Sequence, residues 1–168
     1  MVAAITTDDA PVVLVNGDTF YEHFGKHAPG LQKTKFKAVL TATAAAALSY
    51  AKHGFDTVLE FVVAPRFFSK LESMARTRGV TVCLIVLLPS KEQCASRAAA
   101  RKEFAIADYS QFDEFYAKYG DAPAANVLRV QADWDVDAIV AKVRDGLGRG
   151  DYVLHKLAAE AVEPEDNL

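Results

Sequence analysis

Short, continuous runs of apolar residues alternate along the chain with longer stretches in which apolar residues recur every three or four positions. A short apolar run is typical of a strand buried on both faces, and the three-to-four spacing is typical of an amphipathic helix. The apolar runs predict strands over 12–15, 58–63, 81–88 and 127–131. The periodic stretches predict helices over 31–52, 65–78, 90–101, 109–119 and 135–147.

Residues with special backbone preferences mark several of the helix ends. Gly54 and Gly79 stand where the first two helices would stop, and glycine is favoured at such positions because it adopts left-handed backbone angles without a steric cost. Pro65 suits the first turn of the second helix, where its missing N–H has no helical partner to lose. Ser90 and Gln93 have the spacing of a capping box, which predicts the start of the third helix.

The alternation of strands with helices predicts the fold class and the place of a site. Such an order is typical of an α/β protein, and we expect a three-layer sandwich with a mostly parallel sheet and right-handed crossovers. One domain is predicted over 1–150, followed by a C-terminal tail over 151–168 for which a short helix is left open. Parallel sheets bind ligands at the carboxyl ends of their strands. Asp18, the segment after Glu60 and the segment after Leu88 are therefore expected to share one edge.

Composition and charge narrow the classes of function. The 168 residues are 51% hydrophobic and 24% charged, with a net charge of −3, so no basic face for nucleic acid is predicted. The apolar runs are shorter than the roughly 20 residues that a membrane span needs. The N-terminal residues lack the basic start of a secretory signal. We therefore expect a cytoplasmic protein without a membrane partner.

The cysteines and histidines do not predict a metal site. Cys83 and Cys94 fall in an apolar run and in a helical stretch, with no second cysteine or histidine at the spacing of metal ligands. Reduced, structural thiols are expected, as in most cytosolic proteins. His23 and His27 lie one helical turn apart near Asp18, and metal binding by this pair is left as an alternative.

Three features follow one another along the chain in an order that resembles a known family. The first strand is followed by an Asp-Thr-Phe sequence that begins at Asp18. The second strand carries Glu60 and is followed by Arg66. The third strand ends in a proline before a helical stretch that carries Arg97 and Arg101. This order resembles the P-loop small-molecule kinases, and among them the zeta-toxin and chloramphenicol-phosphotransferase type.

The resemblance implies a role for each of these residues. Asp18 would take the proton from the acceptor hydroxyl, Glu60 would hold the substrate or, through a water, magnesium, and Arg66 would contact the substrate. Arg97 and Arg101 would stabilise the charge on the phosphoryl group transferred from Mg-ATP. Phosphoryl transfer depends on positioning and on neutralising phosphate oxygens, which is chemistry for carboxylates, guanidinium groups and a metal.

The chain departs from this family at the nucleotide site. The family begins with a strand and a GxxxxGK[ST] loop that holds the β- and γ-phosphates, and this motif is absent from the sequence. The expected fold therefore lacks the family's first strand, phosphate loop and helix. In the family, that strand lies between the strands represented here by 58–63 and 81–88. These two strands could pair directly, another strand could fill the place, or the natural chain could start further upstream.

Each candidate residue also has a purely structural alternative. Asp18 could close the turn after the first strand, since aspartate is favoured in turns. Glu60 could be a salt-bridged edge acid in an otherwise apolar strand, where an unpaired carboxylate would be costly. Arg66, Arg97 and Arg101 could lie on solvated surfaces without contacting a ligand.

We therefore predict a kinase-like phosphotransferase domain that acts on a small-molecule hydroxyl and is degenerate or incomplete on its nucleotide side. The alternative is a non-catalytic binding or regulatory α/β module. In either case the partner would be a small-molecule substrate or a nucleotide, and formation of a homo-oligomer is left open.

Overall fold

The chain divides by its internal contacts into two compact units, each with its own sheet and helices. The first consists of the residues up to Val63 together with Phe67–Thr81. The second consists of Ala64–Arg66 together with the residues from Val82 onward. The residues that the computed structural model describes are 12–24, 32–102, 105–120 and 126–154.

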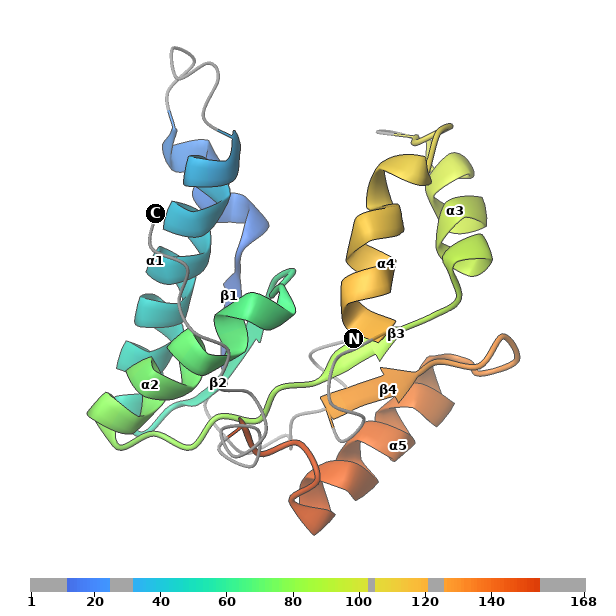
Figure 1. Ribbon diagram of the computed structural model, residues 1–168. Helices are drawn as coiled ribbons and strands as arrows, with labels where there is room; N and C mark the ends of the chain where they lie inside the picture. Colours follow the sequence, from blue (N-terminus) through green and yellow to red (C-terminus); the bar gives the residue numbers. More distant parts are fainter. Residues whose placement is uncertain (1–11, 25–31, 103–104, 121–125, 155–168) are drawn as a thin grey trace. The chain divides into compact units, whose positions relative to one another are not determined.

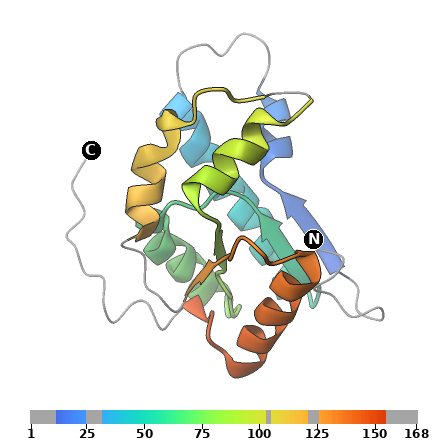
Figure 2. The same cartoon turned by 90° about the vertical axis from the view of Figure 1, so that its right-hand side faces the viewer.

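The first unit contains a two-stranded parallel sheet with a long helix packed against it. The strands are β1 (Val12–Asn16) and β2 (Asp56–Glu60), and helix α1 (Gln32–Lys52) lies between them in the chain (Figure 1). A 3₁₀ helix, η2 (Asp18–His23), follows β1, and α2 (Phe68–Arg78) packs beside α1. Figure 2 shows β1 and β2 side by side, with α1 behind them.

The register of β1 and β2 fixes the edge at which both strands end. The strands pair from Val12 opposite Asp56 to Asn16 opposite Glu60. The N–H of Gly17 then donates to the carbonyl of Glu60 at 2.8 Å, which carries the pairing one residue further. Because the strands are parallel, their carboxyl ends lie at the same edge of the sheet.

The core of the first unit is formed by β1, α1 and α2. Thr43 is fully buried in the middle of α1. Its hydroxyl donates to the carbonyls of Val39 at 2.9 Å and Leu40 at 3.1 Å, so this buried hydroxyl has hydrogen-bond partners. The buried apolar side chains of this unit include Val15, Val39, Leu40, Ala44, Leu48, Val63, Phe68, Leu71 and Ala75.

The second unit repeats the strand–helix–strand order on a smaller scale. Two short strands pair in parallel, from Val86 opposite Val127 to Leu88 opposite Arg129. Its elements are, in chain order, β3 (Val86–Leu88), α3 (Lys91–Ala99), the 3₁₀ helix η4 (Ser110–Phe112), α4 (Asp113–Gly120), β4 (Val127–Arg129) and α5 (Val136–Arg149).

A segment beyond α5 returns to the stretch that precedes β3. Cys83 and Val153 form an antiparallel bridge, flanked by hydrogen bonds of 2.9 Å from the N–H of Leu84 to the carbonyl of Tyr152 and from the N–H of Leu154 to that of Val82. Tyr152 and Leu154 are buried. The first residues of the predicted tail 151–168 are therefore packed into this unit, and 155–168 lie outside the described residues.

The helix ends follow the predicted signals closely. The Ser90 side chain accepts from the N–H of Gln93 at 3.2 Å and the Gln93 side chain accepts from the N–H of Ser90 at 2.9 Å, so the capping box is confirmed. Gly54 and Gly79 have φ angles of 88° and 66° just beyond α1 and α2. Pro65 opens a 3₁₀ turn, η3 (Pro65–Phe67), directly before α2.

The α/β class with parallel strand pairing is confirmed, but two strands differ from their predicted extents. The apolar run 58–63 is a strand only up to Glu60, because β1 has already turned into η2 and offers no further backbone partner. The run 81–88 splits between the antiparallel bridge at Cys83 and the parallel strand β3. Direct pairing of these two runs, one of the three alternatives, is not found among the described strands.

Within the part of the chain that the structure describes, no helix combines the length and apolar character required to cross a membrane.

Candidate functional site

Asp18 and Glu60 meet at the carboxyl edge of the β1–β2 sheet. Glu60 is the last residue of β2 and lies opposite Asn16, the last residue of β1. Asp18 follows two residues later. The Asn16 amide approaches a carboxylate oxygen of Glu60 at 3.5 Å, which is a weak contact. The register thus places the two predicted carboxylates on neighbouring strand ends.

Local hydrogen bonds hold the turn that carries Asp18. The N–H of Asp18 donates to the Asn16 side-chain oxygen at 2.9 Å, and the hydroxyl of Thr19 donates to the Asn16 carbonyl at 2.8 Å. Neither of these bonds involves the Asp18 carboxylate. The residues Asp18 and Glu60 are both exposed. These two exposed carboxylate groups on a fixed backbone can accept hydrogen bonds from a ligand hydroxyl or amine.

An aromatic cluster anchors η2 beside these carboxylates. Phe61, which follows Glu60, lies 6.3 Å from the ring of Tyr21 and 5.5 Å from that of Phe36 in α1, measured between ring centroids. Phe36 also meets Phe67 edge-on at 6.2 Å, and Tyr21 lies 6.4 Å from Phe24. The rings join η2, β2 and α1, and so fix the orientation of the site's turn.

Tyr21 is the residue of this cluster that is electrostatically coupled to the site. Partial burial raises the pKa of its phenol above the usual value, and the negative charge of Asp18 raises it further. The phenol therefore stays a hydrogen-bond donor throughout the neutral range. Sequence reasoning overlooked Tyr21; the signal that could have found it is its spacing of three residues from Asp18.

The three predicted arginines belong to the second unit. Arg66 is exposed in η3, and Arg97 is exposed in the last turn of α3. Arg101 is also exposed but lies beyond α3, which ends at Ala99. The predicted helix over 90–101 therefore ends too late, and Arg101 lies outside the helix that carries Arg97. The helix stops early because the chain folds back, with the N–H of Ile106 bonded to the Ala98 carbonyl at 3.1 Å.

A second polar cluster lies between α3 and α4. The hydroxyls of Tyr109 and Tyr116 interact with each other and with the thiol of Cys94, and partial burial raises the pKa of both phenols. An ion pair between Lys91 and Asp113 joins the same two helices. These polar contacts join α3 and α4, and no ligand is needed to explain them.

The described residues contain no group of three or more histidine, cysteine or acidic side chains arranged to hold a metal. His23 lies in η2, whereas His27 falls outside the described residues. Cys83 and Cys94 are free thiols.

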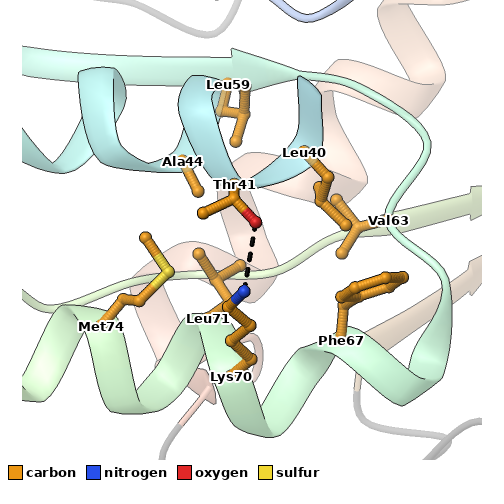
Figure 3. Close-up of a pocket in the computed structure, with 9 residues that line it drawn as sticks. All are labelled: Leu40, Thr41, Ala44, Leu59, Val63, Phe67, Lys70, Leu71 and Met74. Carbon is orange, nitrogen blue, oxygen red and sulfur yellow. Dashed lines mark hydrogen bonds between the residues drawn. The ribbon is translucent and has the colours of Figure 1, made fainter. Parts of the chain in front are cut away.

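A small pocket lies on the helix side of β2, between α1 and α2 (Figure 3). The Lys70 ammonium donates to the Thr41 hydroxyl across it at 3.1 Å. The remaining lining side chains are apolar and include Leu40, Ala44, Leu59, Phe67, Leu71 and Met74. The lining of this pocket contains no carboxylate that could take up the proton of a hydroxyl, so the strand edge remains the better candidate site.

Comparison with protein-family models and with curated protein sequences gives no match for this chain.

Proposed function

We propose that this chain is a kinase-like phosphotransferase domain whose acceptor side is the carboxyl edge of β1 and β2. The observation that carries the proposal is the register that sets Asn16 opposite Glu60, with Asp18 two residues further on. Asp18 would accept the proton of the substrate hydroxyl, and Glu60 would hold the substrate beside it. The proposed architecture is a three-layer sandwich with a mostly parallel sheet that lacks the family's first strand, phosphate loop and helix.

The proposal assigns phosphate contacts to arginines. Arg66 would contact the substrate, and Arg97 and Arg101 would neutralise the phosphoryl group. All three side chains are exposed. The sequence lacks GxxxxGK[ST], so the proposal names no residues that hold the nucleotide and assigns only the acceptor site and the arginines.

Activity with Mg-ATP and a panel of small hydroxyl compounds tests this function. We expect transfer to an acceptor hydroxyl that is abolished by Asp18→Asn, because the amide cannot take up the proton. Asp56→Asn is the matched control: Asp56 is also an exposed carboxylate, but it begins β2, at the opposite end from Glu60. Equal turnover in the Asp18→Asn variant would refute the assignment.

A second candidate is a non-catalytic binding module, which the missing phosphate loop favours. Such a module would be stabilised by a hydroxyl ligand without turning it over, and Mg-ATP would leave its melting temperature unchanged. Tight ATP binding would instead raise the melting temperature by mass action. Turnover would eliminate the module, and ligand binding without turnover or ATP stabilisation would eliminate the kinase.

A further inference from the structure

We propose that the hydroxyl of Tyr21 is a further ligand-binding group at this edge, which donates a hydrogen bond to the oxygen of a ligand hydroxyl while Asp18 accepts the proton of that same hydroxyl. The inference rests on the proposed function, because it takes the edge of β1 and β2 as the acceptor site. It adds a residue to the site and specifies the chemical group that the site selects.

The backbone of η2 places the two side chains on one face. Tyr21 follows Asp18 by three residues, and in a 3₁₀ helix the side chains at positions i and i+3 lie directly above one another. The turn is closed at both ends, by a bond of 3.2 Å from the N–H of Phe20 to the Gly17 carbonyl and one of 3.1 Å from the N–H of Phe24 to the Tyr21 carbonyl. The backbone hydrogen bonds of η2 therefore keep Asp18 and Tyr21 on the same face of the 3₁₀ helix.

Packing restricts the Tyr21 ring while leaving its side chain partly accessible. The ring contacts Phe61, the residue directly after Glu60, and also Phe24. Tyr21 is half-buried, so part of the residue stays exposed although its ring is held. Tyr21 thus approaches the edge from the η2 side, while the chain that carries Glu60 supports its ring.

The pairing of a donor with an acceptor determines which ligand group fits. A hydroxyl both donates and accepts hydrogen bonds, so it satisfies Asp18 and Tyr21 together. An ammonium group only donates, so it could bond to the Asp18 carboxylate, which also attracts its charge, but it could not accept from the Tyr21 hydroxyl. A carboxylate only accepts and would face the Asp18 charge directly. The site should therefore prefer an alcohol over an acid of the same shape, and only the alcohol should use both Asp18 and Tyr21.

A titration without any ligand tests whether Tyr21 lies close to Asp18. The phenol of Tyr21 is followed by ¹³C NMR as the pH rises, in the wild-type chain and in Asp18→Asn. Because the Asp18 charge raises the pKa of the Tyr21 phenol, its removal should lower that pKa. An unchanged Tyr21 titration would overturn the inference whatever the enzymatic activity of the chain.

Binding of three probes of one shape tests the selectivity. Benzyl alcohol, benzylammonium and benzoate differ only in the group presented to the site, and binding is measured from amide shifts of residues 17–21. We expect benzyl alcohol to bind more tightly than benzoate and to lose about fivefold in affinity in Tyr21→Phe, the equivalent of one hydrogen bond, whereas the affinity for benzylammonium, which cannot accept from the phenol, should stay the same. Tyr50→Phe should leave the affinity unchanged.

The outcomes separate this inference from the proposed function. Equal benzyl alcohol affinity in wild type and Tyr21→Phe, or no preference for the alcohol over benzoate, would refute the role of Tyr21, even if Asp18→Asn abolishes turnover. Loss of affinity in Tyr21→Phe together with a chain that never turns over ATP would leave the hydroxyl site standing and remove the kinase.

Discussion

The ring of Phe61 lies directly over Gly17, at the point where β1 gives way to η2. A Cβ atom at Gly17 would come within 2.2 Å of the Phe61 ring. The backbone of Gly17 is helical, with φ −67° and ψ −31°, and other residues can adopt these angles. Glycine is therefore required here because a side chain would not fit, and not because of the backbone angles. This close approach lets η2, and with it Asp18, lie against the end of β2.

Replacing Gly17 with alanine should therefore destabilise the first unit. We expect a loss of about 1–3 kcal/mol in the free energy of unfolding, typical of overpacking, measured by urea denaturation. Gly148→Ala in α5 is the control: no atom lies within 4 Å of a Cβ at that position, and alanine favours a helix, so a gain of about 0.5–1 kcal/mol is expected. A Phe61→Leu background should reduce the cost of Gly17→Ala, and additive effects would contradict the contact.

The side chain of Asn126 should contribute strongly to the stability of the second unit. Its side-chain amide is buried and donates to the carbonyls of Leu84 at 2.9 Å and Tyr152 at 3.0 Å, which joins the two antiparallel segments. Asn126→Leu leaves both carbonyls without this donor and should cost about 2–4 kcal/mol.

Hydrogen exchange locates this effect. The amides of Leu84 and Leu154 bond across the same two segments, so both should lose protection in Asn126→Leu. Gln131→Ala is the control, since the exposed Gln131 side chain makes only a bond of 3.4 Å and should change stability by no more than about 0.5 kcal/mol. Unchanged protection at Leu84 and Leu154 would show that Asn126 does not hold the segments together.

Stability at alkaline pH should depend on Tyr119. Burial raises the pKa of its phenol to about 12, above the ordinary value of 10.0. The folded chain therefore keeps a proton that the unfolded chain loses, so the contribution of Tyr119 is complete below about pH 10 and is lost as the pH rises toward 12. Urea midpoints measured from pH 9 to 12 should fall less steeply in Tyr119→Phe than in wild type, and Tyr50→Phe should follow wild type.

The capping box at the start of α3 should contribute measurably to stability. Ser90→Ala removes the acceptor for the N–H of Gln93 and should cost about 1 kcal/mol. Ser96→Ala, at an exposed position inside the same helix, should be neutral or slightly stabilising, because alanine is the better helix former. Equal effects of the two substitutions on thermal unfolding would argue against the cap.

Local sequence signals predicted the helix ends accurately. The period of three to four, together with Ser90, Gln93, Gly54 and Gly79, placed the start of α3 and the ends of α1 and α2 within a few residues of those observed. These signals succeed because capping and helix periodicity depend on residues close together in the chain. Strand ends were less accurate: Glu60 was expected inside its strand and is in fact the last residue of β2.

The candidate site was predicted only in part. The ends of the first two strands were expected at one edge, and the register of β1 and β2 agrees with that expectation. The segment after Leu88 was expected at the same edge, but it follows β3, which pairs with β4 in a different sheet. Tyr21 and Phe61 were not found, since the contact between them joins residues forty positions apart. Nothing in either segment alone indicates that a glycine in one lies under a ring of the other.

The sequence alone determined the α/β class, the order of its elements and the presence of an acid near the end of each of the first two strands, because each depends on patterning within a few neighbouring residues. Only the tertiary structure decided which strands pair, where β2 stops and which ring lies beside Asp18. Those features depend on backbone groups and side chains brought together from distant positions, where hydrogen bonds and close packing select one partner among many of similar polarity.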